Sequence, residues 1–463
     1  MDEAAVAAAL TRHLGGAPTV EGLRRLSGGA SRETWSFDAQ LGDERLALVL
    51  RRDPGQAVAG PLDRSTEADV LSAAHDAGVL TPRVRFVLEP ADELGSGFVM
   101  DRVEGETVAR RILRDDAYAS ARGRLAGQCG EAAARIHAVS TAALPTLPAL
   151  GPLEQLAQYR SVLDSFGEPH PAFELGLRRL ARDVPTVDEP TLVHGDFRNG
   201  NLVVGPDGLR AVLDWELTHL GDPVEDLGWL CVKSWRFGVT EHPVGGFGEV
   251  GDLTAAYEAA GGRPVEPTRL RWWEAFGTLK WGVICEIQAQ THLQGLVRSV
   301  ELATLGRRIA EMEWDLLELL DDGPTAPAGS PARVGADPRD ARPESLQDRP
   351  SAPELVAAVR EFLERDVVGS VEGRVGFHAR VAVNALGMVE RELVLGPGLD
   401  AAARARLAAY LGHDGDLGTL LGELATRIRD GALDDDPDAF AATRATVRSK
   451  LEVSNPRYAA DEP

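Results

Sequence analysis

Alternating apolar and polar positions predict β-strands near the start of the chain. Residues 19–55 alternate in this way around glycine turns, which indicates two or three antiparallel strands. Residues 64–78 change to a helical period and end in glycine, so we expect an amphipathic helix there. Two further strand-like runs follow at 83–89 and 97–103. This order of strands, helix and strands predicts a small α+β lobe over residues 1–103, a normal size for a compact unit.

Beyond this lobe, apolar positions recur with the period of a helix. The clearest helical stretches are 119–140, 268–293 and 297–320. Between the first two, a Gly-Pro-Asp-Gly turn flanked by apolar runs predicts a β-hairpin. We therefore expect a second, mostly helical lobe over residues 104–320, with the hairpin set into it.

The last third of the chain has a different composition. Residues 321–353 are rich in Pro, Ala and Asp and nearly lack large apolar side chains, which is typical of a flexible linker. Helical periods return after it, so residues 354–463 are expected to form a separate all-α domain. The helices expected there lie at 354–367 and at about 375–394, 399–412 and 417–431.

Composition limits the classes of partner. The chain has 463 residues, too many for one ordinary core, so two or three domains are expected. Lys plus Arg number 49 against 72 Asp plus Glu, and the formal charge of −23 argues against nucleic acid or an anionic membrane as a main partner.

No apolar run approaches the roughly 20 residues that span a bilayer, and the acidic N-terminus does not resemble a signal peptide. Three cysteines far apart, without a CxxC pair, fit a reducing compartment, so a cytoplasmic protein is expected.

The stretch LVHGDFRNGNLVVGPDGLRAVLDWE, residues 192–216, gathers polar side chains around the hairpin. In a hairpin the start of the first strand lies beside the end of the second, which places Asn201 next to Asp214. Asp196 sits on the loop that leads into the first strand. A turn-rich surface hairpin is the simpler interpretation, but two carboxylates and an amide oxygen in a small volume also suit Mg²⁺ with substrate phosphates. Asp214 and Asn201 could then hold the metal, and Asp196 could take the proton of an attacking hydroxyl.

The motif HGDFRNGN, followed by a hairpin and an aspartate, resembles the catalytic loop of the aminoglycoside phosphotransferase-like kinases. His194, Asp196 and Asn201 match the HxDxxxxN pattern of that loop, and Asp214 matches the metal-binding Asp. The resemblance implies a bilobal, protein-kinase-like α+β fold, with an antiparallel-sheet N-lobe and a mostly helical C-lobe. It also implies ATP and Mg²⁺ as cofactors. We expect His194 to orient the loop through a hydrogen bond rather than to act directly, because this chemistry asks for a carboxylate base.

The next stretch, LGDPVEDLGW at residues 220–229, is also similar to this family. The resemblance implies that Asp222 and Asp226 chiefly hold the structure of the loop. Glu216 would point the same way as Asp214 in a strand. Its role as a second metal contact and its role as a solvated or structural residue both stay open.

The resemblance also predicts nucleotide-binding parts in the N-terminal lobe. A loop over the phosphates is expected, and the sequence offers Ser27, Gly28 and Gly29 in a strand turn. The glycines on their own would mean only a hairpin turn. The run FVMDRVEG resembles the linker between the lobes, whose backbone reads the nucleotide base, with Met100 to Val103 placed there.

A cation on the third strand and a helix carboxylate that positions it complete the expected nucleotide site. Arg51, at the end of LALVLR, is assigned the first role although the family usually has Lys. Arg is always charged and can fork onto phosphate oxygens, and Arg52 is the competing residue. Glu67 on the following helix is assigned the second role, with an ordinary surface residue as the alternative.

Other polar and aromatic residues have more than one interpretation. Arg198 and Asn199 could touch substrate or merely shape the loop. Residues 246–251 fit GxGxxG, but they follow no buried strand, so we expect a flexible loop near the acceptor side rather than a dinucleotide site. Tryptophans such as Trp272 and Trp273 are expected in the core.

Finer resemblance suggests the acceptor. VLRRDPG, MDRVEG, LVHGDFRNGN and AVLDWELTHLGDPVEDLGW are most similar to the branch related to the kinase domain fused to some acyl-CoA dehydrogenases. This resemblance covers roughly residues 20–320 and implies a small-molecule acceptor of the hydroxyacyl-CoA type, whose hydroxyl is phosphorylated before removal. An aminoglycoside or macrolide kinase, slightly favoured by the acidic charge, and a catalytically inactive binding protein are the alternatives. The intact Asp196, Asn201 and Asp214 argue against the inactive protein.

The C-terminal part, about residues 354–460, resembles a small helical domain of unassigned function that accompanies bacterial kinases of this branch. The resemblance suggests an accessory role, such as acceptor binding. A stabilising or dimerising appendage is the equal alternative, so a homodimer stays open.

Overall fold

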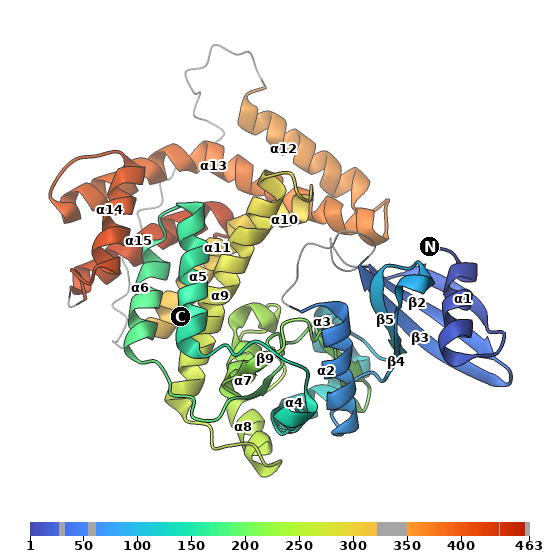
Figure 1. The fold of residues 1–463 in the computed structure, drawn as a ribbon. Helices are drawn as coiled ribbons and strands as arrows, with labels where there is room; N and C mark the ends of the chain where they lie inside the picture. The colour runs from blue at the N-terminus through green and yellow to red at the C-terminus, as the bar shows by residue number, and fades with distance from the viewer. Residues whose placement is uncertain (27–32, 54–61, 322–349, 435, 459–463) are drawn as a thin grey trace. The chain divides into compact units, whose positions relative to one another are not determined.

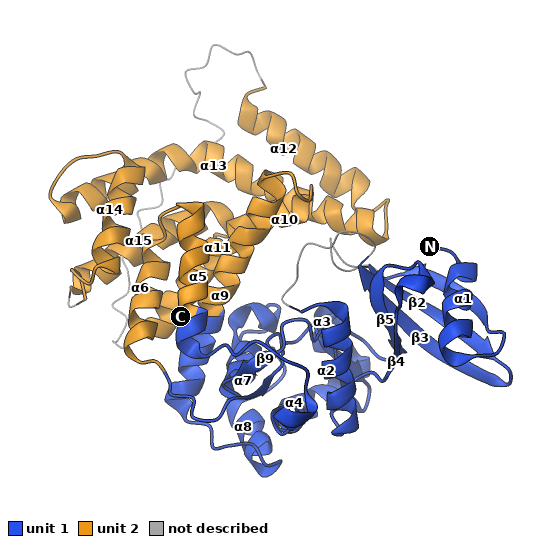
Figure 2. Ribbon diagram, in the orientation of Figure 1, with its two compact units in different colours: residues 1–155, 185–277 blue, residues 156–184, 278–463 orange. Residues whose placement is uncertain are grey.

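The computed structural model describes most of the chain. The described residues are 1–26, 33–53, 62–321, 350–434 and 436–458. They form two compact units, and each is treated by itself (Figure 2). Unit 1 consists of residues 1–155 and 185–277, and unit 2 consists of residues 156–184 and 278–463.

Unit 1 begins with a five-stranded antiparallel sheet in the order β1-β2-β3-β5-β4 (Figure 1). Its strands are β1 (Thr19–Arg25), β2 (Glu33–Leu41), β3 (Glu44–Asp53), β4 (Val84–Val87) and β5 (Ser96–Asp101). Leu10 of helix α1 (Glu3–Leu14) shares a buried cluster with Leu48 and Leu50 of β3. Neighbouring strand residues face opposite sides, so Arg51 points away from that cluster. Helix α2 (Arg64–Asp76) packs on β4 and β5, which confirms the predicted order of strands, helix and strands.

The rest of unit 1 holds two short strand pairs and a set of helices. The pairs are β7 (Leu202–Gly205) with β8 (Gly208–Val212), and β6 (Thr191–Val193) with β9 (His219–Gly221). The helices are α3 (Ala109–Arg114), α4 (Ala119–His137), α7 (Val224–Cys231) and α8 (Val250–Ala259). Helix α4 supports the β7–β8 hairpin, because the Oε1 atom of Gln128 accepts the Leu209 N–H at 2.9 Å. Gly130 lets α4 approach α8, since a Cβ there would lie 2.3 Å from the Leu253 carbonyl oxygen.

Unit 2 is helical over its described residues. Its helices, of which α5 and α9 begin in unit 1, are α5 (Pro152–Phe166), α6 (Pro171–Arg182), α9 (Pro267–Leu293), α10 (Val300–Leu305), α11 (Ile309–Leu320), α12 (Ala352–Phe362), α13 (Gly373–Leu411), α14 (Leu417–Arg429) and α15 (Pro437–Ser454). One buried cluster joins Leu175 of α6 and Trp314 of α11 to Leu407, Leu424 and Val447 of the last three helices. The all-α prediction for the C-terminal region is therefore confirmed.

Two details of the C-terminal region differ from the sequence prediction. Helices expected at about 375–394 and 399–412 are one continuous helix, α13, which contains Pro397. Proline removes one backbone hydrogen bond and usually kinks a helix. Contacts with α15 hold α13 on both sides of it, since Arg391 donates to the Val453 carbonyl oxygen and Arg406 donates to Ser449. Helix α15 was not expected, although Pro437 in its first turn after the Asp436 cap is a typical helix start.

The predicted domain boundaries stay predictions. Residues 322–349, which are most of the predicted linker, lie outside the described residues. Segments from both sides of the linker contribute to the single cluster around Trp314, and unit 2 combines residues 156–184 and 278–320 with the C-terminal helices. The compact units therefore follow a different division from the predicted lobes and C-terminal domain.

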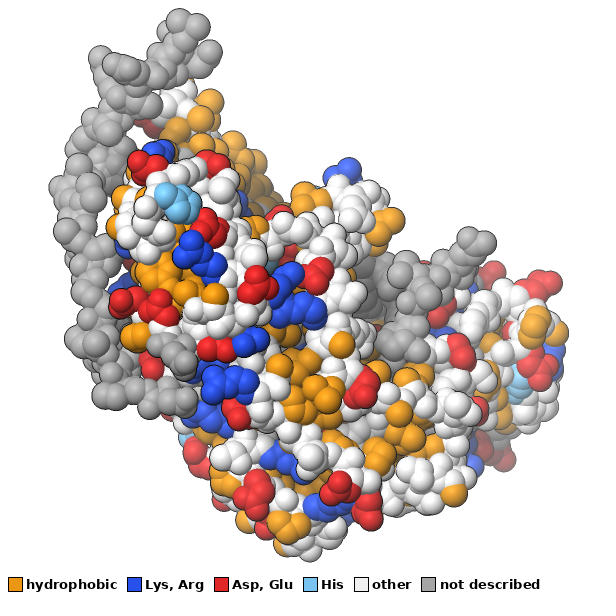
Figure 3. Space-filling view, turned by 60° about the vertical axis from the view of Figure 1, so that its left-hand side comes forward, with side chains coloured by type: hydrophobic (Ala, Val, Ile, Leu, Met, Phe, Trp, Pro, Cys, Tyr) orange, Lys and Arg blue, Asp and Glu red, His pale blue; other side chains and the backbone are white. Residues whose placement is uncertain are grey.

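The surface charge, the helices and the cysteines each add one fact. Figure 3 shows acidic and basic side chains interspersed across one face, so the negative charge is not gathered into one patch there. No helix in the described part of the chain is both long and apolar enough to cross a membrane. Cys129, Cys231 and Cys285 are buried and form no disulfide.

Candidate active site

Asp226, near the start of α7, anchors the loop that carries His194 and Asp196. The backbone N–H groups of His194 and Gly195 donate to its two carboxylate oxygens at 2.8 and 2.9 Å. The Nε2 atom of His137 donates to the same carboxylate at 3.0 Å. Burial favours the neutral form of Asp226, but the His137 hydrogen bond and the adjacent backbone donors outweigh it and lower its pKa. Asp226 therefore holds the loop, as the family resemblance implies.

His194 is buried and both of its ring nitrogens are used. Its Nδ1 atom accepts the Asp196 backbone N–H at 3.2 Å, and Nε2 lies 3.1 Å from the Leu213 carbonyl oxygen. A carbonyl can only accept, so Nε2 carries the proton. Burial lowers the pKa of His194, which keeps the ring neutral. This geometry suits the expected orienting role, because neither nitrogen is available to take a proton from a substrate.

The carboxylate of Asp196 is fixed on both oxygens. Oδ1 accepts from the Trp229 indole at 2.8 Å and from Arg198 Nε at 2.9 Å, and Oδ2 accepts from Asn201 Nδ2 at 2.6 Å. The side chain keeps 14% of its exposure. Asp196 is thus held in one direction while it remains reachable, which a general base requires. Trp229 was not predicted to take part, and only its place in LGDPVEDLGW could have suggested it.

The hairpin brings Asn201 and Asp214 together as predicted. The Leu213 N–H donates to the Asn201 carbonyl oxygen at 2.8 Å, across the open end of β7 and β8. Asp214 has φ +69°, a left-handed conformation that few residues other than glycine adopt. Burial opposes ionisation of Asp214, but the charge and hydrogen bond of Arg51 outweigh it and lower its pKa. Backbone strain of this kind is common where a side chain must be aimed at a ligand.

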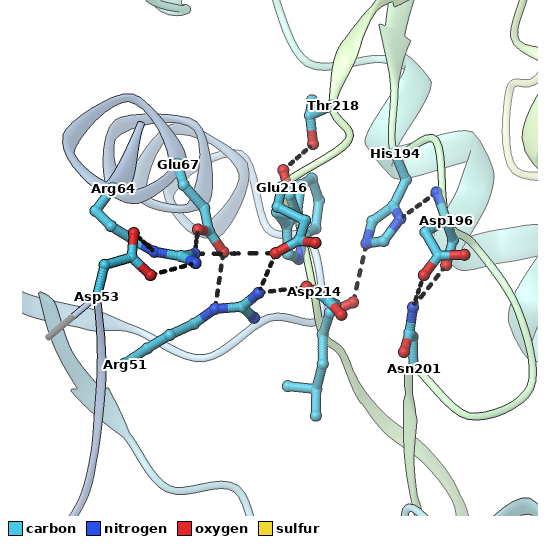
Figure 4. A network of polar contacts seen from close by, with 12 residues as sticks. Arg51, Asp53, Arg64, Glu67, His194, Asp196, Asn201, Asp214, Glu216 and Thr218 are labelled. Carbon is cyan, nitrogen blue, oxygen red and sulfur yellow. Dashed lines mark hydrogen bonds and ion pairs between the residues drawn. The ribbon is translucent and has the colours of Figure 1, made fainter. Parts of the chain in front are cut away.

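Arg51 of β3 lies at the centre of an ionic network (Figure 4). It forms an ion pair with Asp214, a second with Glu216 at 2.7 Å, and a third through Nε with Glu67 of α2 at 3.4 Å. Arg52 points to the other face of β3 and pairs with Glu33 at 2.8 Å. Arg51 is therefore the arginine that reaches Asp214. Glu67 is buried rather than a surface residue.

Two residues that the sequence did not single out complete this network. Arg64 is buried and pairs with Glu67 one helical turn along α2, and with Asp53 at 3.1 Å. Glu67 thus lies between two arginines, and its direction toward Arg51 is fixed by Arg64 (Figure 4). No sequence motif marks Arg64; only its position three residues before Glu67 on a predicted helix could have suggested it.

Asn199 and Arg198 differ in where they lie. Asn199 is buried and its Nδ2 donates to the Gly245 carbonyl oxygen at 2.7 Å, so it shapes the loop. Arg198 contacts Asp196 and stacks its guanidinium 4.5 Å from the Trp235 ring centre.

Residues 246–251 are more closely packed than the flexible loop expected from sequence, since Gly246 and Phe247 are buried.

The other predicted nucleotide-binding residues are described only in part. Ser27, Gly28 and Gly29 lie outside the described residues. Met100 belongs to β5 and pairs with β3, and Val103 follows the end of that strand. Shortly after, Glu106 and Val204 exchange two backbone hydrogen bonds of 2.9 Å. The segment therefore runs from the sheet to the β7–β8 hairpin, and its role as a linker that reads the nucleotide base stays a prediction.

A family model described as the phosphotransferase enzyme family matches residues 22–273. The chain belongs to this family. The match includes Arg51, Glu67, the His194–Asn201 loop and Asp214. Residues 369–458 match a second model, described as a domain of unknown function.

Two curated relatives match this chain over part of their length. Acyl-CoA dehydrogenase family member 10 of Mus musculus is 30% identical over 199 residues, which are 40% of this chain and 18% of that protein. Acyl-CoA dehydrogenase family member 11 of Gallus gallus is 30% identical over 220 residues, or 45% of this chain and 27% of that protein. The chain therefore spans only a minor part of these relatives.

A solved structure shares the fold. A candidate aminoglycoside phosphotransferase from Ralstonia eutropha superposes with a TM-score of 0.54 at 24% identity, over 68% of this chain and 98% of that one. This likeness confirms the predicted phosphotransferase fold, with an antiparallel N-terminal sheet and a mostly helical remainder.

Proposed function

We propose that this chain is an ATP- and Mg²⁺-dependent kinase that phosphorylates a hydroxyl group of a small molecule. The observation that carries the proposal is the convergence of Asp196, Asn201, Asp214 and Arg51 from the loop, the hairpin and the sheet (Figure 4). A base, oxygen ligands for a metal and a cation for phosphates are the parts that phosphoryl transfer requires. Membership of the phosphotransferase family supports the same reaction class.

Asp214 and Asn201 have the donor atoms that Mg²⁺ requires. Asp214 has a lowered pKa, and its side chain keeps 33% of its exposure. The amide nitrogen of Asn201 donates to Asp196, so its oxygen is the atom that would face a metal. Mg²⁺ takes a small number of such oxygens and completes its shell with water and phosphates. When bound, it would neutralise charge on the transferring phosphoryl group.

Asp196 would accept the proton of the acceptor hydroxyl as its oxygen attacks the terminal phosphorus of the nucleotide. The new O–P bond forms while the bond to the ADP oxygen breaks. Trp229 and Asn201 hold the two carboxylate oxygens, so the base does not rotate away. Arg51 would place its charge against the phosphates, with Glu67 keeping the guanidinium in position.

The acceptor class within this proposal is a hydroxyacyl-CoA-type thioester. Its support is the sequence shared with acyl-CoA dehydrogenase family members 10 and 11. A hydroxyl is a poor leaving group and a phosphate is a better one, so such a kinase would prepare a hydroxyacyl chain for elimination. An accessory role for the C-terminal helices, a homodimer and a cytoplasmic location remain predictions.

The proposal is tested by measuring ADP release from MgATP over a panel of acceptors. The panel holds 4-hydroxyacyl-CoA thioesters, the free acids, aminoglycosides and macrolides, with Asp196→Ala as the control. We expect ADP release that depends on a thioester and is lost in the variant. ADP release with an antibiotic alone would show that the acceptor is an antibiotic and not a hydroxyacyl-CoA thioester. No MgATP binding and no turnover would favour an inactive binding protein and overturn the proposal.

A further inference from the structure

His170 stands at the start of α6 in unit 2, with a carboxylate fixed behind its ring. The Nδ1 atom of His170 lies 2.9 Å from Oε1 of Glu313, which is fully buried on α11. Lys450 of α15 holds both oxygens of Glu313, at 3.0 and 2.9 Å. A carboxylate can only accept here, so Nδ1 carries the proton and Nε2 faces the opposite way. This carboxylate–histidine arrangement is the usual support of a metal-binding histidine.

The open side of His170 faces a second buried carboxylate. The Nε2 atom lies 3.5 Å from Oε2 of Glu286 on α9, and Glu286 is only 3% exposed. Neither oxygen of Glu286 nor Nε2 of His170 has a hydrogen-bond partner among the described residues. A buried carboxylate without hydrogen bonds is costly unless a cation compensates it.

Glu168 completes the group from the loop between α5 and α6. Gly167, with φ +73°, makes the turn that brings Glu168 and His170 to the same place. Ligand atoms of Glu168, His170 and Glu286 all lie within 4.8 Å of one another. Glu168 is exposed, so the group is open to solvent on its side.

We propose that Glu168, His170 and Glu286 bind one divalent first-row transition-metal ion, of which Zn²⁺ fits best. Bonds of about 2.0–2.1 Å in a tetrahedral zinc site separate two ligand atoms by about 3.3 Å. The 3.5 Å between His170 and Glu286 is already close to that separation. An imidazole nitrogen favours such an ion over Mg²⁺ or Ca²⁺, which prefer oxygen ligands alone. A water molecule would fill the fourth position on the exposed side.

The ion would tie helices of unit 2 together. Glu168 and His170 lie at the junction of α5 and α6, and Glu286 belongs to α9. Glu313 of α11, which contacts His170, also pairs with Lys450 of α15. None of these residues belongs to the candidate active site, so the inference does not depend on the proposed kinase activity. We expect the ion to stabilise the fold rather than to take part in phosphoryl transfer.

A proton on Nε2 of His170, instead of a metal ion, is the alternative for this site. Burial acts to lower the pKa of His170, but Glu286 and Glu313 outweigh it and raise it to about 9. A proton on Nε2 would then compensate Glu286 without a metal. Metal binding and protonation are exclusive at this atom, so direct titration with a metal separates them.

The test is a zinc titration of the full-length, metal-free chain in competition with a chromophoric chelator. We expect one zinc per chain and a rise in Tm on loading. Glu286→Gln and Glu168→Gln should each weaken zinc binding by at least about tenfold, the size that loss of even a supporting residue produces. Asp214→Asn should keep this zinc, which separates the site from the active site.

His413→Asn is the matched control, because His413 is exposed and pairs with the single carboxylate of Glu423 at 2.8 Å. It should bind zinc as the unaltered chain does. Glu168 is exposed, so Glu168→Gln stays informative even where Glu286→Gln unfolds the chain. A folded chain that binds no zinc, or unchanged zinc affinity in Glu168→Gln and Glu286→Gln, would overturn the proposal in favour of a protonated His170.

Discussion

Arg51 and Asp214 form an ion pair although 163 positions separate them in the chain. One belongs to the N-terminal sheet and the other follows the β7–β8 hairpin. The pair therefore joins the predicted phosphate-binding and metal-binding parts of the site within unit 1. It also lowers the pKa of Asp214, which keeps that carboxylate ready for a cation.

Replacing Arg51 is expected to impair turnover more than replacing its neighbour. Arg51→Ala should lower kcat/KM for MgATP on the order of a hundredfold, because one preorganised cation is lost from the phosphates. Arg52→Ala is the matched control, since Arg52 pairs with Glu33 on the other face of β3. Steady-state kinetics of ADP release would compare them. Equal losses in both variants would contradict the assignment of Arg51.

Asp214→Asn is expected to weaken the use of Mg²⁺ while the backbone is kept. Asparagine tolerates the left-handed conformation at φ +69°, so the change removes charge rather than shape. The Mg²⁺ concentration for half-maximal activity should rise by about tenfold or more, as for a lost supporting ligand. Titrating Mg²⁺ at fixed ATP measures this. Asp207→Asn, on the exposed hairpin turn, should leave the Mg²⁺ dependence as it is.

The buried Asp226 is expected to make stability depend on pH. Its folded pKa is lowered below the ordinary 3.8, so its contribution is present above that pH and is lost as the pH falls through the folded value. Asp226→Asn should cost about 3 kcal/mol at pH 7, because His137 and two backbone donors lose a charged partner.

Denaturant unfolding at several pH values measures the difference between the two chains. The gap between Asp226→Asn and the unaltered chain should shrink as the solution is acidified below pH 4, as far as both remain folded. Asp252→Asn, an exposed change on α8, should stay within about 0.5 kcal/mol at every pH. A gap that is independent of pH would contradict an ionised Asp226.

The C-terminal helices are expected to be energetically coupled to α6 and α11. Leu424 of α14 is buried in the cluster that contains Trp314, so Leu424→Ala should cost about 2–5 kcal/mol. Hydrogen exchange should then become faster at the backbone amides of α11 as well as in α14. Faster exchange confined to the C-terminal helices would show an independent domain, as the sequence boundaries predict.

The sequence was sufficient for the parts of the site that are local in the chain. The His194–Asn201 motif, the hairpin and Asp214 lie within one short stretch, where turn chemistry and strand length already decide which residues meet. Arg51 and Glu67 could be assigned because the family resemblance supplied the order of parts. The choice between Arg51 and Arg52 depends on which face of the sheet each side chain points to. A shift of one residue in the register of β3 would exchange the two faces, so the sequence alone could not decide it.

Contacts between distant segments were beyond the sequence. Arg64 has no motif, and its role depends on which helix face meets Arg51 and Asp53. The meeting of His170, Glu286 and Glu313 joins three helices far apart in the chain, and none of the three residues lies in a recognisable ligand spacing. Helix α15 packs into the same core as α6 and α11. The linker-like composition of residues 321–353 predicted separate domains instead.

Asp196→Asn is the most direct test of Asp196 as the general base of a kinase. MgATP binding by calorimetry and ADP release with a 4-hydroxyacyl-CoA thioester should be measured on the variant and the unaltered chain. We predict unchanged MgATP affinity and a kcat lowered by about 10²–10⁴-fold, because only the base is lost. A variant that binds MgATP equally and turns over at the original rate would contradict Asp196 as the base.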